Sequence, residues 1–144
     1  MSKEIKQKLT VVKVGGAVVE DDAQLAQLLK DFSAIEGNKV LVHGGGRRAT
    51  QVAKSLGIES KMVNGRRITD SDMLQVVTMV YGGLVNKNLV ARLQANDVNA
   101  MGLTGADMNV LLSDRRPPKK MLIKGENGQP DEEQTVDFGF VGDV

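Results

Sequence analysis

The sequence contains no cysteine and no tryptophan, and only three phenylalanines and one tyrosine occur among its 144 residues. The lack of cysteine excludes disulfides and cysteine-ligated zinc, and it agrees with the reducing cytoplasm that we expect as the location. With so few aromatic rings, the core has to be built from Val, Leu, Ile, Met and Ala. No apolar run approaches the roughly 20 residues that a transmembrane helix needs, and the N-terminus has no apolar segment typical of a signal peptide.

Neither sign of charge is in excess, because 19 basic residues face 18 acidic ones. Dedicated nucleic-acid binders usually carry a strong basic excess, so we expect neither a nucleic-acid nor a membrane partner. A chain of 144 residues suits one domain with a buried core, and we treat residues 1–144 as a single domain. Glycine is frequent, with 16 residues, and several of these glycines are clustered.

The first 57 residues alternate between β-branched runs and amphipathic stretches. Buried strands are predicted at 9–14 and 39–43, each ending in glycines, and helices at 20–35 and 49–56. This order predicts an α/β fold, in which parallel strands are joined by right-handed crossovers and helices cover the sheet.

The pattern after Gly57 is less regular. Asn64-Gly65 predicts a hairpin between two short strands within 61–69. Thr69 or Asp70 can cap a long helical stretch that reaches Leu93 and is interrupted at Gly82-Gly83. The remaining expected elements are a strand at 98–103, a β-pair formed by 109–113 and 121–124, a polar loop at 124–134 and a last strand at 137–141.

The first candidate site is Lys13-Val14-Gly15-Gly16, at the carboxyl end of the first strand. Ligands of open parallel sheets bind outside such ends, and glycines let a phosphate or carboxylate approach backbone N–H groups. Gly15 and Gly16 are therefore candidate contacts for nucleotide phosphates, and Lys13 can counter charge on a transferring phosphoryl group. An ordinary surface lysine beside a turn is the alternative interpretation.

The second candidate site is His43-Gly44-Gly45-Gly46, between the second strand and its helix. Glycines before a helix N-terminus form an anion site from free N–H groups and the helix dipole. We expect His43 to fix the strand end by a hydrogen bond rather than to act as a base or metal ligand, and no metal-binding residues are assigned.

The glycine triplet also admits other interpretations. Residues 44–49 fit a G-x-G-x-x-A dinucleotide-binding fingerprint, but the acidic residue expected after the next strand is missing. The same triplet resembles the oxyanion loop of lipases, although no G-x-S-x-G motif is present. A Walker-type phosphate loop is absent from the sequence.

A third candidate follows the predicted hairpin turn, where Arg66 and Arg67 stand together. A guanidinium binds a carboxylate in a bidentate fork, as an anchor for a small acidic substrate would require. Arg47 and Arg48 add positive charge directly after the glycine triplet. A solvated arginine face is the usual alternative.

The three motifs KVGG, HGGG and NGRRIT occur here in the order and near the spacing found in the amino-acid kinase family. The segments GLVNKNLVARL at 83–93 and GLTGADMNVL at 102–111 are also similar to that family. The resemblance implies a three-layer αβα sandwich around a mainly parallel sheet. It further implies transfer of the γ-phosphoryl group of ATP, with Mg²⁺, to the side-chain carboxylate of an N-acylated glutamate such as N-acetylglutamate, a step of arginine biosynthesis.

Residue roles follow from the same resemblance. Lys13 resembles the lysine that stabilises the transition state, and Gly45 and Gly46 resemble the backbone donors that face the reacting carboxylate. Arg67 resembles the arginine that holds the substrate's α-carboxylate. A carboxylate is already ionised at neutral pH, so the reaction needs no general base.

The sequence departs from the family pattern in ways that carry further expectations. The nucleotide-binding half is missing, so we expect an N-terminal, substrate-binding part that is inactive alone; a non-catalytic binding module is the alternative. Arg47 stands where relatives carry an uncharged residue, and as a contact to a larger acyl group it would favour N-succinylglutamate. Only about eight residues precede the first strand, whereas arginine-inhibited members carry a longer N-terminal helix, so we expect a homodimer without arginine feedback.

Overall fold

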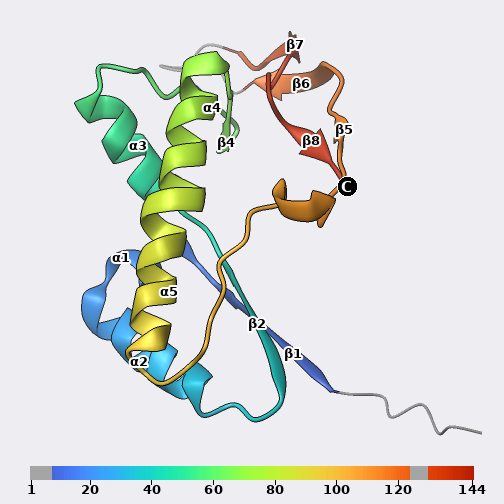
Figure 1. Cartoon of the computed structure of the whole chain (residues 1–144). Coiled ribbons are helices and arrows are strands. Elements are labelled where there is room, and N and C mark those ends of the chain that lie inside the picture. Colours follow the sequence, from blue (N-terminus) through green and yellow to red (C-terminus); the bar gives the residue numbers. More distant parts are fainter. Residues whose placement is uncertain (1–7, 124–129) are drawn as a thin grey trace, which may run out of the picture.

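The computed structural model describes residues 8–123 and 130–144. Figure 1 shows a long parallel strand pair with helices packed along one side, and short strand pairs formed by the C-terminal part of the chain. Within these residues, none of the helices combines the length and apolarity that crossing a membrane would require.

The parallel pair consists of β1 (Leu9–Val14) and β2 (Asn38–His43), which run side by side over their whole lengths. Their alternating side chains separate two faces. Val12 and Leu41 pack against the helical core, whereas Val11 and Val40 on the opposite face are 59% and 44% exposed. The predicted parallel strands and the α/β class are confirmed. The described residues thus form two of the three expected layers, a strand pair and the helices on one of its faces.

Three helices connect and cover the strands. The predicted helices are α2 (Asp22–Ser33) and α3 (Gly46–Ser55). A left-handed glycine follows each of them, Gly57 directly after the C-cap of α3 and Gly37 four residues after the end of α2. The short helix α1 (Gly16–Glu20) was not predicted, because a single turn carries no measurable apolar period.

A long helical rod crosses the helical layer. It consists of α4 (Ser71–Val77), the π-helix η1 (Thr78–Val85) and α5 (Asn86–Gln94). Asp70 caps the rod by accepting a hydrogen bond from the Met73 N–H at 2.9 Å, as predicted. The interruption expected at Gly82-Gly83 takes the form of the wide π turns, which recur at functional sites.

The core lies between α2, α3 and the rod, and it contains aliphatic side chains with a single aromatic ring. Its buried members are Leu25, Leu29, Phe32, Ala49, Ala53, Met73, Val76, Val80, Val85, Leu89 and Leu93.

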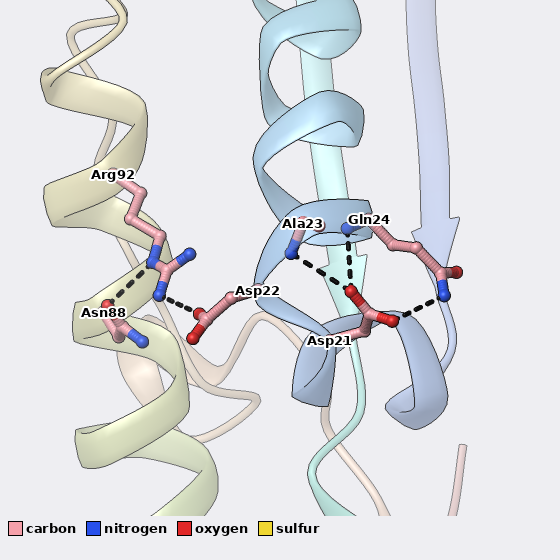
Figure 2. A network of polar contacts seen from close by, with 6 residues as sticks. All are labelled: Asp21, Asp22, Ala23, Gln24, Asn88 and Arg92. Carbon is pink, nitrogen blue, oxygen red and sulfur yellow. Dashed lines mark hydrogen bonds and ion pairs between the residues drawn. The ribbon is translucent and has the colours of Figure 1, made fainter.

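A polar network ties α2 to α5 (Figure 2). Asp21 caps α2 by accepting from the N–H groups of Ala23 and Gln24 at 3.1 and 3.0 Å. One residue later, Asp22 forms an ion pair with Arg92 of α5 at 2.5 Å. Adjacent aspartates therefore have separate tasks, since one begins the helix and the other fixes it to the rod.

The predicted hairpin is formed by β3 (Met62–Val63) and β4 (Arg66–Arg67), which pair in antiparallel fashion. Asn64 and Gly65 both have positive φ, 47° and 76°. This backbone conformation is the reason that Asn-Gly is favoured between two hairpin strands.

The C-terminal part contains the 3₁₀ turn η2 (Asp107–Asn109) and two small antiparallel pairs. β5 (Asp114–Arg115) pairs with β8 (Gly142–Asp143), and β6 (Lys119–Ile123) pairs with β7 (Glu132–Val136). An ion pair between Arg116 and Asp143 holds the first of these pairs together and lowers the pKa of the Asp143 carboxyl.

Several expectations for this part were wrong. Residues 98–103 form an extended segment without strand pairing, although Figure 1 shows them running beside β2. Residues 109–113 are not a strand, because Met108 and Asn109 take left-handed φ values of 52° and 54° that end any extended run.

The predicted partners of the C-terminal strands were also wrong. Residues 121–123 lie in β6 but pair with β7, whose first three residues were expected to belong to the loop at 124–134. The loop residues 124–129 lie outside the described part. The expected strand at 137–141 is interrupted at Gly139, whose φ of 73° turns the chain onto Thr69.

The N-cap of α2 gives a testable dependence on pH. The pKa of Asp21 is lowered from its ordinary value of 3.8, first by the backbone N–H and then by the side-chain amide of Gln24. Because the folded-state pKa is depressed, this carboxylate contributes stability that is complete above pH 3.8 and is lost as the pH falls through the folded-state value.

We therefore expect Asp21→Ala to lower the melting temperature at neutral pH, and we expect its difference from the unaltered protein to narrow in acid. Asp21→Asn is the control, because asparagine also caps helices but does not titrate. Thermal unfolding followed by circular dichroism over an acid pH series measures both differences. A constant deficit of the alanine variant at all pH values would contradict this account.

Candidate functional site

The two glycine turns leave the same edge of the parallel pair. In the register of β1 and β2, Val14 lies opposite His43, so Gly15-Gly16 and the Gly44–Gly46 loop follow neighbouring positions at the carboxyl ends of the strands. The two motifs therefore adjoin, as the prediction of parallel strands that each end in glycines implies. Ligands of parallel sheets bind at this edge.

The glycine loop leads directly into α3. Gly45 is the N-cap residue, no side chain caps the helix, and its first turn contains no acidic residue. The first N–H groups of a helix have no intrahelical acceptors, and the helix dipole adds partial positive charge there. This end of α3 therefore has the features of an anion-binding site.

Tyr81 of the rod packs against the glycine loop. A Cβ atom at Gly45 would lie 2.8 Å from Cδ1 and 3.0 Å from Cε1 of the Tyr81 ring. The φ of Gly45, −164°, is accessible to any residue, so glycine is required at this position by the ring and not by the backbone. Sequence reasoning missed this contact, because Tyr81 matched the apolar face of the predicted helix.

Arg67 reaches the first turn of α3 from the hairpin. Its guanidinium donates to the Gly46 carbonyl at 2.9 Å, to Thr50 Oγ1 at 2.8 Å and to Ser60 Oγ at 2.8 Å. In residues 8–123 and 130–144, no carboxylate forms an ion pair with it, so its charge is oriented without being neutralised. The neighbouring Arg66 is exposed, which agrees with the choice of Arg67 as the anchor.

Lys13 and Arg47 lie on the surface around these turns. Lys13 is exposed on the uncovered face of the strand pair, opposite Val42 in the register. Arg47 is exposed in the first turn of α3. Gly15 caps the single turn of α1, where its carbonyl accepts from the Val19 N–H at 3.2 Å.

His43 has the structural task expected of it. Its Nδ1 atom lies 3.2 Å from the Gly44 carbonyl oxygen, and its Nε2 atom lies 3.2 Å from the amide nitrogen of Asn86. The imidazole thus links the strand end to the glycine loop and to the rod. Asn86 belongs to the segment GLVNKNLVARL at 83–93, whose sequence alone assigns it no role.

A groove of about 880 Å³ lies next to this network, between β2 and the extended segment that follows the rod. His43, Tyr81 and Asn86 line it, together with the loop from Gly102 to Gly105. Asp107 follows this loop and accepts hydrogen bonds from the backbone N–H and hydroxyl of Thr104, and these bonds lower the pKa of Asp107.

The described residues do not by themselves offer a metal site, since no three His, Asp or Glu side chains among them are grouped to hold an ion. A magnesium ion needs carboxylate or other oxygen ligands. We therefore assign no Mg²⁺ ligand in the described part of the chain.

Comparison with known proteins decides the family. A model of the amino acid kinase family matches residues 8–138. The chain belongs to the amino acid kinase family. This finding confirms the resemblance carried by the KVGG, HGGG and NGRRIT motifs.

Sequence similarity to individual proteins agrees with this family assignment. The chain is 64% identical over 144 residues to the acetylglutamate kinase of Bacteroides fragilis and 64% identical over 140 residues to that of Bacteroides thetaiotaomicron. A more distant acetylglutamate kinase, from Methanopyrus kandleri, is 40% identical over 136 residues, or 94% of this chain. The chain spans about half the length of these relatives, 48–49%.

Solved structures agree at the level of the fold. N-acetylglutamate synthase of Neisseria gonorrhoeae, determined with coenzyme A and N-acetyl-glutamate, matches 93% of this chain and 27% of its own, with a TM-score of 0.58 and 20% identity. The protein smu.665 of Streptococcus mutans matches 67% of this chain and 40% of its own, with a TM-score of 0.57 and 26% identity.

The contact between Gly45 and Tyr81 yields a stability prediction. Gly45→Ala places a methyl group against the ring, and we expect this overpacking to cost about 1–3 kcal/mol of the free energy of unfolding. Gly44→Ala is the matched control, because nothing lies within 4 Å of a Cβ there, and its effect is expected within about 0.5 kcal/mol. Urea unfolding measures both. Equal stability of the two variants would show that the ring does not constrain Gly45.

Proposed function

We propose that this chain is the N-terminal, substrate-binding part of an acetylglutamate kinase. The observation that carries the proposal is the junction of two glycine turns at one sheet edge, with Arg67 anchored to the first turn of α3. High identity to relatives named acetylglutamate kinase supports the choice of substrate. In this proposal residues 1–144 form the acyl-glutamate-binding domain, and the nucleotide-binding half is supplied from outside them.

The proposed reaction joins two anions. A γ-carboxylate oxygen of N-acetylglutamate attacks the γ-phosphorus of ATP, the bond from that phosphorus to the bridging oxygen breaks, and an acyl phosphate and ADP result. The nucleophile is already ionised, so no proton has to be removed. The work of the protein is to position the reactants and to offset their repulsion.

Each candidate residue has a place in this scheme. The N–H groups of Gly45 and Gly46 would bind the reacting carboxylate, and Arg67 would hold the α-carboxylate as a fork. Gly15 and Gly16 would contact the nucleotide phosphates, while Lys13 would stabilise charge on the phosphoryl group in flight. ATP is the co-substrate in this proposal, Mg²⁺ would accompany it, and arginine biosynthesis in the cytoplasm by a homodimer is the proposed setting.

The overall assignment is tested by trapping the acyl phosphate with hydroxylamine. The full-length protein is expected to form the hydroxamate from ATP and N-acetylglutamate, whereas the 144-residue chain is expected to bind N-acetylglutamate without turnover. Binding without product in the full-length protein would favour a non-catalytic binding module. Turnover by the 144-residue chain alone would refute the assigned division of roles.

The roles of Lys13 and Arg67 differ in the kinetic constant that they affect. Lys13→Ala is expected to lower kcat by about 10²–10³-fold, because the charge acts on the transition state. Arg67→Ala is expected to raise the Kd for N-acetylglutamate at least about thirtyfold, because a charged carboxylate loses its partner. Steady-state kinetics and calorimetry on the full-length protein measure these effects.

Two other exposed cations provide the controls. Lys8→Ala removes a charge directly before β1, at the opposite end of the strand from Lys13, and Arg66→Ala removes the charge next to Arg67 in the sequence. Both variants are expected to stay near the unaltered values. An unchanged kcat in Lys13→Ala, or equal binding by the Arg66 and Arg67 variants, would contradict the assignment.

Arg47 is exposed at the start of α3, where it could contact a substrate. N-succinylglutamate is therefore a second candidate substrate. If Arg47 contacts an additional carboxylate, N-succinylglutamate is the better substrate and Arg47→Ala reverses the preference. The kcat/KM ratio for the two acyl glutamates, measured with and without Arg47→Ala, tests this. A preference for the acetyl compound in both proteins would end the succinyl alternative.

A further inference from the structure

Asn86 is a buried polar residue at the start of α5, with only 6% of its surface exposed. Its Nδ2 atom lies 3.2 Å from His43 Nε2 and 3.3 Å from the Leu103 carbonyl oxygen. Its Oδ1 atom lies 3.1 Å from Lys87 Nζ, which also donates to the Gly102 carbonyl at 3.0 Å. A buried amide with this many partners has a defined orientation.

The hydrogen-bond partners of Asn86 determine which side-chain atom is the oxygen and which is the nitrogen. An ammonium group has only donors and a backbone carbonyl only accepts, so Lys87 must face Oδ1 and Leu103 must face Nδ2. The side-chain nitrogen of Asn86 therefore donates to Nε2 of His43. That ring nitrogen has to be unprotonated, and in the neutral imidazole the hydrogen is carried by Nδ1. His43 then donates from Nδ1 to the Gly44 carbonyl oxygen.

This last hydrogen bond has a direct consequence for the anion site. The Gly44 carbonyl and the Gly45 N–H belong to one peptide unit, and the described residues contain no cis peptide bond. In a planar trans peptide, the C=O and N–H point in opposite directions. Fixing the Gly44 oxygen therefore fixes the direction of the Gly45 N–H, the proposed donor to the reacting carboxylate.

The backbone at Gly102 packs directly against the side-chain amide of Asn86. A Cβ at Gly102 would lie 1.9 Å from Asn86 Oδ1, so only glycine lets the extended segment pass over it. The Tyr81 ring also lies close to the loop, since a Cβ at Gly45 would come within 2.8 Å of it. The His43 imidazole contacts Gly44, and the Tyr81 ring packs near Gly45.

We propose that Asn86 is a positioning residue, which selects the Nδ1–H tautomer of His43 and thereby orients the Gly45 N–H toward the substrate carboxylate. The inference rests on the proposed function for the identity of that carboxylate. Asn86 itself touches neither substrate nor nucleotide in this scheme. The chain of donors runs from Lys87 through Asn86 and His43 to the peptide that forms the anion site.

The tautomer can be measured without a substrate. His43 is the only histidine in the 144 residues, so two-bond ¹H–¹⁵N correlation spectra of histidine-labelled protein report a single imidazole. We expect the Nδ1–H tautomer at neutral pH. An Nε2–H tautomer in the unaltered protein would overturn the proposal, whatever the behaviour of any variant.

The variant Asn86→Asp tests whether Asn86 selects the tautomer of His43. A carboxylate of the same shape cannot donate, so we expect a hydrogen on Nε2 of His43 in this variant. Asn88→Asp is the matched control on the same helix, because Asn88 is exposed and accepts from Arg92, a task that aspartate also performs. Retention of the Nδ1–H tautomer in folded Asn86→Asp would overturn the proposal.

A pair of uncharged variants tests the effect on the site. In His43→Asn, the side-chain nitrogen lies two bonds from Cβ, as Nδ1 of histidine does, so it can still donate to the Gly44 carbonyl. In His43→Gln, the side-chain nitrogen lies one bond farther from Cβ, so it reaches toward Asn86 and no longer donates to Gly44. Calorimetry with N-acetylglutamate on the full-length protein is expected to give an affinity near the unaltered value for the asparagine variant and about tenfold weaker binding for the glutamine variant.

The outcomes separate this inference from the proposed function. Equal affinities of the two His43 variants, or weaker binding by the asparagine variant, would overturn the positioning role while leaving the substrate assignment intact. If the unaltered protein binds no N-acetylglutamate, the proposed function fails. The spectra of the unaltered protein and of Asn86→Asp then still decide whether Asn86 sets the tautomer and the orientation of the loop.

Discussion

The parallel register of β1 and β2 is the constraint on which the rest of the site depends. Because Val14 lies opposite His43, both strands end at the same level and both glycine turns leave from one edge. A shift of the register would separate the turns along the strand direction and would also exchange the faces of β2, since side chains alternate. The core contacts of Val12 and Leu41 oppose such a shift. Packing on one face of the strands thus determines the chemistry at their ends.

Much of this arrangement could be predicted from local sequence. The strands, the helices α2 and α3, the Asp70 cap and the Asn64-Gly65 turn all follow from periodicity and from residues with restricted backbone preferences. The adjoining of the two glycine turns also followed, because consecutive strands with a helical crossover pair in parallel. Each of these features is determined by residues that are close to it in the sequence.

The features that sequence reasoning missed depend on distant partners. A strand was expected at 121–124, but its pairing with 132–136 was missed, because nothing within either segment specifies the other. The contact of Tyr81 with Gly45 and that of Asn86 with His43 each bridge the rod and the glycine loop. An asparagine within an apolar helical stretch was the available sign that Asn86 has a buried partner, but its partner could not be named before the fold was known.

The residues on the two sides of the proposed site differ in how firmly hydrogen bonds and packing fix them. On the acyl-glutamate side, Arg67 is fixed by Ser60, Thr50 and Gly46, and the glycine loop contacts His43 and packs near Tyr81. On the phosphoryl side, Lys13 is exposed, and within the described residues no hydrogen bond or ion pair restrains its side chain. Preorganised donors lower the cost of binding an anion, so under the proposed function these residues would favour binding of the carboxylate. The lysine is left to be oriented by the phosphate charge that it would neutralise.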